Sequence, residues 1–282
     1  MKKGISIWSF PNEMSIQECI NLAAKEGFDG IELALNETGL MSLESTADEI
    51  SVYKKAARAA GIEISSLATG LYWSYSLTSE NELIRKKAAD IVKKQLDMAQ
   101  ILEVDTILVV PGAVGVDFIP NCEIVDYDVA YERALTSITE LAGYAEAKGI
   151  SIGIENVWNK FLLSPLEMKS FIDSIGSEYV GAYLDVGNVV YSGYPEHWVK
   201  ILGKRIKKVH FKDYRREVGS AAGFVDLLSG DVNFPAVIKR LKDIGYESYI
   251  TAEMIPPVPF YKYYPEQLIH NTSKAMDRIL GR

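Results

Sequence analysis

One local pattern returns along the chain, and it restricts the possible folds more than any other feature of the sequence. An amphipathic helical segment ends at a glycine, and a short apolar segment follows; these glycines include Gly27, Gly61, Gly149 and Gly245. Glycine in this position adopts the left-handed conformation that terminates a helix. The segments after the glycines are apolar on both faces, as expected of buried parallel strands. The pattern therefore predicts a series of helix–strand units.

The series is long enough to close a barrel. The predicted strands lie at about 4–9, 29–34, 62–68, 105–110, 150–156, 180–185, 206–211 and 248–254. The predicted helices lie at about 15–26, 44–60, 79–103, 127–148, 165–175, 195–203, 234–244 and 264–281. Eight such units without a linker predict a single (β/α)8 TIM barrel over residues 1–282. A doubly wound sheet is the alternative, but no glycine-rich phosphate turn follows the first strand.

Composition and charge exclude several classes of protein. Apolar residues make up 48% of the 282 residues, which is ample for a large core, and the net charge is −8. An acidic protein lacks the basic face that nucleic acids require. Cys19 and Cys122 form no disulfide framework, so we expect a reducing compartment. No segment reaches the roughly 18 apolar residues of a membrane span, and the N-terminus does not resemble a secretory signal. The sequence predicts a cytoplasmic protein with no membrane partner.

Four residues of metal-ligand type stand at the C-terminal ends of predicted strands: Glu155, Asp185, His210 and Glu253. The C-terminal strand ends of a barrel converge on one mouth, where barrel enzymes hold their active sites. This mixture of oxygen and nitrogen ligands suits a hard or borderline divalent cation. The two glutamates are also candidate acid/base groups. Each of these residues, taken alone, is also explained by a purely structural role. Glu32 ends a predicted strand as well, and it is a candidate ion-pair partner or substrate contact.

Aromatic and polar residues are concentrated in the loops that follow the predicted strands. Trp8 follows the first strand, Tyr72 the third, and Trp158 and Asn159 the fifth. Aromatic walls with a few polar groups suit a small polyol, which presents both C–H and O–H surfaces. We therefore expect Trp8, Tyr72 and Asn159 to contact a substrate.

Several segments together resemble a known family: 155–161, Asp185-Val186-Gly187-Asn188, His210-Phe211-Lys212-Asp213, 230–234 and Glu253-Met254. They are similar to the xylose isomerase-like TIM-barrel superfamily, and most of all to its sugar-phosphate isomerases and epimerases. These include the ketose 3-epimerases and the L-xylulose and L-ribulose 5-phosphate 3-epimerases. The resemblance covers nearly the whole chain. It implies that Glu155, Asp185, His210 and Glu253 bind one divalent ion, commonly Mn²⁺, with Co²⁺, Mg²⁺ or Zn²⁺ as alternatives.

The resemblance also implies roles for individual residues. Glu155 and Glu253 become a proton-transfer pair. Asn188 stands where the free ketose 3-epimerases carry a histidine, as in the phosphate-sugar branch. The family places an arginine a few residues after the histidine ligand; Arg215 and Arg216 both fit, and we favour Arg216 as a substrate contact. Lys212 and Asn188 are candidates both for supporting the metal ligands and for contacting the substrate.

The activity implied is an isomerase or epimerase of carbohydrate metabolism that acts on a ketose or ketose phosphate. Removing a weakly acidic C–H proton next to a carbonyl requires a base, and a metal stabilises the enediolate that forms. A keto-polyol (inosose-type) dehydratase with the same metal site is the alternative. A DNA repair endonuclease with three zinc ions would need more than the three histidines present. A metal-free binding barrel would have lost some of the metal-ligand residues, whereas all four candidates are present here.

The substrate's charge and the oligomeric state remain open in the sequence. Lys160, Lys212, Arg215 and Arg216 follow strands that lead to the mouth, which predicts an anionic substrate end. The alternative is that 204–216 is a solvated basic stretch in which Lys212 alone turns toward a carboxylate. The apolar, proline-rich segment 256–264 is suited either to wall the pocket or to pack on a second copy of the chain in a homo-oligomer.

Overall fold

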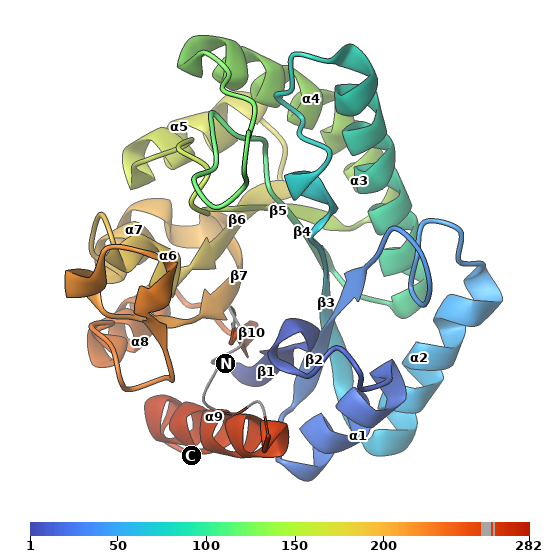
Figure 1. The fold of residues 1–282 in the computed structure, drawn as a ribbon, viewed down its shortest axis with the longest axis vertical. Helices are drawn as coiled ribbons and strands as arrows, with labels where there is room; N and C mark the ends of the chain where they lie inside the picture. Colours follow the sequence, from blue (N-terminus) through green and yellow to red (C-terminus); the bar gives the residue numbers. More distant parts are fainter. Residues whose placement is uncertain (255–260, 262) are drawn as a thin grey trace.

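Eight parallel strands form a closed barrel in the computed structural model, which describes residues 1–254, 261 and 263–282 (Figure 1). Their order around the barrel is β1-β10-β7-β6-β5-β4-β3-β2. The strands are β1 (Lys2–Ser6), β2 (Gly30–Leu35), β3 (Glu63–Thr69), β4 (Thr106–Val109), β5 (Ser151–Glu155), β6 (Val180–Asp185), β7 (Ile206–Phe211) and β10 (Tyr249–Ala252). This confirms the predicted (β/α)8 barrel.

Helices surround the barrel, and most follow the predicted positions (Figure 1). They are α1 (Ile16–Lys25), α2 (Ala47–Ala60), α3 (Glu82–Leu102), α4 (Tyr127–Lys148), α5 (Pro165–Ile175), α6 (Val186–Val190), α7 (Pro195–Leu202), α8 (Phe234–Asp243) and α9 (Pro265–Leu280). The four glycines of the repeated pattern have φ between 67° and 78°. Each therefore ends its helix in the left-handed region, as predicted.

The structure differs from the prediction where short elements shape the mouth of the barrel. The first strand ends at Ser6 rather than at residue 9, because Ile7–Ser9 form the 3₁₀ turn η1, capped by the Ser6 side chain. The described part of the chain contains four more 3₁₀ turns: η2 (Leu71–Trp73), η3 (Gly203–Arg205), η4 (Arg216–Val218) and η5 (Ala221–Gly223). The helix α6 and the antiparallel pair β8 (Asp213–Tyr214) and β9 (Phe224–Val225) were not predicted. Elements of two to five residues are too short to show a hydrophobic period.

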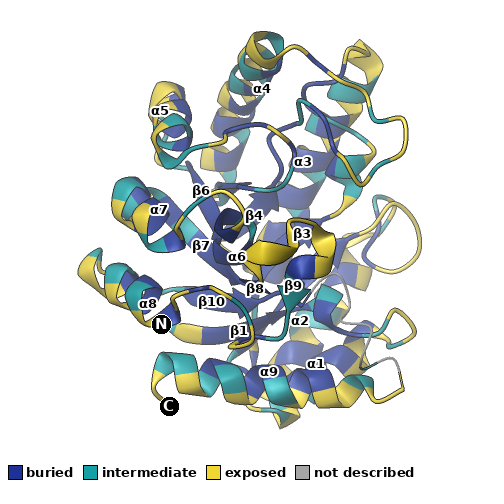
Figure 2. Cartoon of the chain, turned by 60° about the vertical axis from the view of Figure 1, so that its left-hand side comes forward, coloured by how far each residue is buried: buried dark blue, intermediate teal, exposed yellow. Residues whose placement is uncertain are grey.

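Burial follows the layers of the fold. The helices expose their outer faces, whereas the barrel strands are buried, as Figure 2 shows. The barrel interior is not wholly apolar: Glu32, Ser66, Tyr183 and His210 are fully buried in it. Among the described helices, none is long and apolar enough to cross a membrane. The predicted pocket-wall or subunit-contact segment 256–264 lies largely outside the described residues.

Close strand packing generates a prediction at Gly181 in β6. A Cβ atom there would lie 2.3 Å from the backbone oxygen of Arg205, which cannot move without disturbing the barrel. We expect Gly181→Ala to lower the free energy of unfolding by about 1–3 kcal/mol, as overpacking does. The control is Gly143→Ala, because nothing lies within 4 Å of that Cβ in α4; this change should be neutral or stabilising. Urea unfolding measures both, and equal stabilities would contradict the packing.

Candidate metal centre

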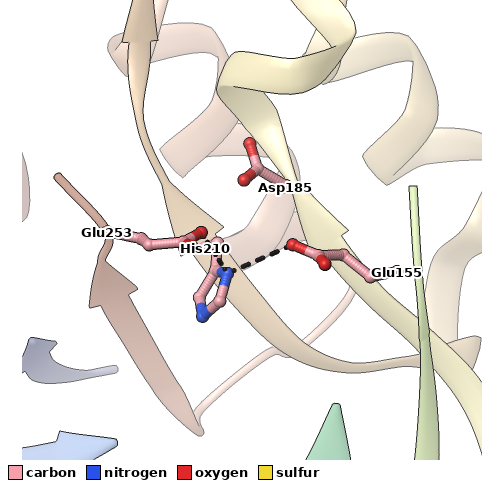
Figure 3. Close-up of side chains that lie close together, drawn as sticks. All are labelled: Glu155, Asp185, His210 and Glu253. Atoms are coloured by element: carbon pink, nitrogen blue, oxygen red, sulfur yellow. Dashed lines mark ion pairs between the residues drawn. The ribbon is translucent and has the colours of Figure 1, made fainter. Parts of the chain in front are cut away.

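The four predicted ligand residues meet at the C-terminal mouth of the barrel (Figure 3). Glu155 ends β5, Asp185 ends β6, His210 lies one residue before the end of β7, and Glu253 directly follows β10. One nitrogen or oxygen atom from each lies within 4.8 Å of the others, and all four residues are buried. The structure thus brings together side chains that are up to 98 positions apart in the sequence.

The donor set fits a divalent cation. Bonds of about 2.0–2.2 Å to one ion require ligand atoms no more than about 4.4 Å apart, so shifts of a few tenths of an ångström would suffice. Among the described residues, Asp185 Oδ2, His210 Nδ1 and Glu253 Oε2 are buried atoms without a hydrogen bond. Their close polar contacts are the ion pairs that they form with one another, with Glu155 and with Lys212. Because buried polar atoms normally have hydrogen-bond partners, a divalent cation held among these three atoms would fit the site.

Asn156 and Asn188 hold Asp185 in place. The Asn156 side chain donates to the Asp185 carbonyl at 2.8 Å and accepts from the Asp185 backbone N–H at 2.9 Å. Asp185 Oδ1 accepts from the Asn188 N–H at 2.9 Å, where it caps α6. These bonds leave Oδ2 to face the site. This role of Asn156 was not predicted from the sequence, where the available signal is its position directly after Glu155.

His210 is oriented by Glu32. His210 Nε2 lies 3.0 Å and 3.2 Å from the two carboxylate oxygens of Glu32, which can only accept a hydrogen bond when ionised. Nε2 therefore carries a proton, and Nδ1 faces Glu253 Oε2 at 2.9 Å and Glu155 Oε1 at 3.4 Å. A carboxylate behind a metal-binding imidazole fixes the tautomer and the ring orientation. Figure 3 shows Glu155 and Glu253 approaching His210 from opposite sides.

Glu32 is itself held across the barrel interior. Tyr183 donates to Glu32 Oε2 at 2.6 Å, and Ser66 donates to the same oxygen at 2.8 Å. The pairing of β2 with β3 shifts register at Glu32, and the pairing of β6 with β7 shifts at Tyr183. Such irregularities re-aim side chains and are frequent next to active sites. Glu32 was predicted to be an ion-pair partner or a substrate contact, and the structure pairs it with His210.

Burial and neighbouring charges separate the two glutamates. Burial raises the pKa of Glu155 to about 7. Burial alone would also raise the pKa of Glu253, but the positive charges of Lys212 and His210 outweigh burial and lower this pKa to about 2. Lys212 Nζ lies 2.7 Å from Glu253 Oε2 and 2.9 Å from Asp185 Oδ2. Before a metal binds, Glu155 is the carboxyl that takes up a proton near neutral pH.

Gly187 explains the Asp-x-Gly-Asn spacing. A Cβ atom on Gly187 would lie 2.4 Å from Lys212 Cβ and 3.0 Å from its backbone carbon. Only glycine at this position lets α6 pack closely against Lys212, which lies between β7 and β8. This close packing allows the Lys212 ammonium to reach the Asp185 carboxylate. The motif thus sets the distance between two parts of the site.

A cavity of about 1000 Å³ opens over the centre. Of the predicted substrate contacts, Trp8, Asn188 and Lys212 line it, together with Glu155 and Glu253. The cavity has the size and the largely apolar lining of a small-molecule site.

The structure does not bring the other three predicted contacts, Tyr72, Asn159 and Arg216, into that lining. Tyr72 is buried and donates to Gln95 Oε1 at 2.8 Å. Asn159 donates to the Gly112 carbonyl at 2.7 Å and also accepts from a backbone N–H, so it shapes the loop. Both residues follow strands, but the Tyr72 side chain bonds to the helix α3 and the Asn159 side chain bonds to loop backbone. Sequence spacing alone does not predict these directions.

Comparisons with known proteins agree with this architecture. The family model described as xylose isomerase-like TIM barrel matches residues 20–276. An L-ribulose 3-epimerase of Methylomonas sp. is 26% identical over 82% of this chain and 75% of its own. The L-ribulose-5-phosphate 3-epimerase UlaE of Escherichia coli is 22% identical over 87% of this chain and 86% of its own.

Two solved structures share the fold over the whole length. D-psicose 3-epimerase of Clostridium cellulolyticum H10, with D-tagatose, has a TM-score of 0.82 at 19% identity and covers 100% of this chain and 99% of its own. The IOLI protein with a bound zinc atom has a TM-score of 0.80 at 18% identity and covers 100% and 98%. At these identities the two structures show the fold alone.

The position of Glu32 generates a prediction for the metal site. Glu32→Gln keeps the shape of the side chain but removes the charge behind His210. We expect the affinity for Mn²⁺ to fall by about 10- to 100-fold, as for other partners of metal-binding histidines, while the fold is retained. Calorimetric titration of metal-free protein measures the affinity, with Glu63→Gln on the neighbouring strand as control, since Glu63 pairs with Lys2 at the surface. An unchanged affinity in Glu32→Gln would remove the orienting role.

Proposed function

The chain belongs to the xylose isomerase-like TIM barrel family, and we propose that it is a divalent-metal-dependent ketose 3-epimerase. The observation that carries this proposal is the placement of Glu155 and Glu253 on opposite sides of His210 at one candidate metal centre (Figure 3). Inverting a carbon next to a carbonyl needs one group to remove a proton from one face and another group to return a proton to the opposite face.

The relatives support the same reaction. The Methylomonas and Escherichia coli proteins are named as 3-epimerases of L-ribulose and L-ribulose 5-phosphate. Both names describe inversion at the carbon beside a ketose carbonyl.

A metal ion would be held by Glu155, Asp185, His210 and Glu253. When bound, a divalent ion would polarise the substrate carbonyl and stabilise the negative charge of the enediolate. Three carboxylates and one imidazole suit Mn²⁺, which we favour. Co²⁺, Mg²⁺ and Zn²⁺ also accept some of these ligand types and are the alternatives.

Glu155 and Glu253 would move the proton. Their environments push their pKa values apart, to about 7 for Glu155 through burial and to about 2 for Glu253, where Lys212 and His210 outweigh burial. These pKa values describe the protein before a metal binds. With the ion bound, one glutamate would remove the proton from one face and the other would return it on the opposite face, and the roles exchange for the reverse reaction.

Other residues would position the substrate and exclude water. Trp158 donates from its indole N–H to the Asn188 carbonyl at 3.1 Å, which holds both beside the cavity. Lys212, although buried, keeps its proton because Asp185 and Glu253 raise its pKa. Its ammonium is therefore available to donate a hydrogen bond to a substrate hydroxyl next to Glu253.

Deuterium exchange tests the reaction. Protein loaded with Mn²⁺ is incubated with a panel of ketoses in D₂O, and products are followed by NMR. We expect deuterium at C3 of a ketose together with formation of its 3-epimer, since the proton removed exchanges with solvent. Loss of water with a new enone absorbance would instead identify a keto-polyol dehydratase, and absence of exchange in every ketose and ketose phosphate would reject the proposed function.

Substitution of the two carboxylates tests their roles. Glu155→Gln and Glu253→Gln should each lower kcat by about 100- to 10,000-fold, the usual contribution of a general acid or base. The double variant should lose much less than the product of the two effects, because both act in one proton path. The control is Glu247→Gln, which changes an exposed glutamate before the opposite end of β10. Wild-type turnover in either single variant at saturating metal would exclude that residue from proton transfer.

A further inference from the structure

The charges around the cavity do not favour an anionic substrate. Among the described residues that line it, the charged ones are Glu13, Glu155, Glu253 and Lys212. Three glutamates and one lysine carry two net negative charges, which a bound divalent ion would neutralise. The buried Asp185 adds a further negative charge. Lys212 lies within 2.9 Å of both Asp185 and Glu253, so its charge is already balanced. The described part of the lining therefore has no surplus positive charge for a phosphate group.

Arg216, the predicted phosphate or substrate contact, is bound elsewhere. Its Nε donates to the Val190 carbonyl at 3.0 Å and its Nη2 to the Gly193 carbonyl at 3.3 Å. Its guanidinium lies 4.9 Å from the centre of the Tyr194 ring. These contacts hold η4 against the loop after α6, outside the cavity lining.

The remaining basic residues predicted at the mouth are likewise engaged. Lys160 pairs with Asp117 at 2.6 Å, and Arg215 Nε donates to the Ser229 carbonyl at 3.0 Å. Neither lines the cavity. Of the four cations that the sequence suggested for an anionic substrate end, Lys212 alone therefore lies in the described part of the lining.

The cavity walls are aromatic and the space exceeds one small sugar. The lining includes Trp8, Phe10, Trp73, Phe118, Trp158 and Phe224. Its volume of about 1000 Å³ reaches the upper end of the range for sites that hold drug-sized ligands, about 300–1,000 Å³. A ketose of five or six carbons is smaller than such a ligand and would leave part of the wall uncovered.

The uncovered part of the wall lies away from the candidate metal centre. Trp73 ends η2 after β3, and Phe118 follows β4, whereas the ligands come from β5, β6, β7 and the residue after β10. Trp73 and Phe118 contact each other edge to face, with ring centres 5.1 Å apart. Phe118 is 52% exposed. Together with the half-buried Trp73 it forms a contiguous aromatic patch in the cavity wall, and contiguous apolar patches of this kind favour a ligand contact.

We propose that the substrate is an uncharged ketose that carries a second ring, which lies on Trp73 and Phe118 while the reacting carbon lies at the candidate metal centre. This inference rests on the proposed function for the reacting end and adds the chemical class of the remote end. A ring presents a flat face that an aromatic side chain can cover, and no counter-charge is required.

The test compares three probes: D-fructose, D-fructose 6-phosphate and 6-O-benzyl-D-fructose. Calorimetry measures their binding to Mn²⁺-loaded protein and to metal-free protein, and C3 deuterium exchange measures kcat/KM. We expect the benzyl ether to bind at least tenfold more tightly than fructose, in both forms of the protein, and the phosphate to bind no better than fructose at low salt. Tightest binding of the phosphate, or no advantage of the benzyl ether, would overturn the proposal.

Variants locate the second ring. Trp73→Ala should remove the tenfold advantage of the benzyl ether over fructose, whereas Trp73→Phe should retain most of it. Leu166→Ala, which changes an exposed apolar residue on α5, should alter neither probe. An advantage that survives Trp73→Ala would overturn the assignment of this wall. The expected binding order without any C3 exchange would reject the 3-epimerase activity and leave the second-ring subsite standing.

Discussion

The burial of Glu155, Asp185 and Glu253 around one imidazole is the constraint on which the rest of the site depends. Removing three carboxylates from water is unfavourable unless cations compensate them. Lys212 supplies one positive charge, and it reaches Asp185 and Glu253 only because Gly187 allows close approach. Apart from these ion pairs and the contacts of His210 with the two glutamates, Asp185 Oδ2, His210 Nδ1 and Glu253 Oε2 have no hydrogen-bond partner in the described part of the chain. A divalent ion would complete this balance, which makes metal binding the expected resting state of the folded protein.

The same constraint reaches into the barrel through Glu32. A barrel interior is normally filled by branched apolar side chains, but here Ser66, Tyr183 and His210 surround the Glu32 carboxylate. The network satisfies a buried charge and at the same time fixes the imidazole. Part of the barrel core therefore supports the site. Substitution of its polar residues should lower the affinity for metal more than it lowers the free energy of unfolding.

Much of the fold and the ligand set could be predicted because each depends on local signals. Glycine after a helix ends it wherever it occurs, and a ligand-type residue at a strand end reaches the mouth of any barrel, as Glu155, Asp185 and His210 do. Side-chain direction within a loop has no such signal. Tyr72 and Arg216 follow strands as expected, yet hydrogen bonds to Gln95 and to backbone carbonyls turn them away from the cavity lining. The link from Glu32 to His210 joins positions 178 residues apart and appears only once the barrel has closed.

The central claim is that the four residues hold one divalent ion, and crystals grown with Mn²⁺ test it most directly. An anomalous difference map collected near the manganese absorption edge should contain one strong peak within bonding distance, about 2.0–2.3 Å, of Glu155, Asp185, His210 and Glu253. Crystals of Asp185→Asn grown in the same way should lose that peak while the barrel is unchanged. A wild-type map without a peak at this position, or a peak equally strong in Asp185→Asn, would contradict the metal centre.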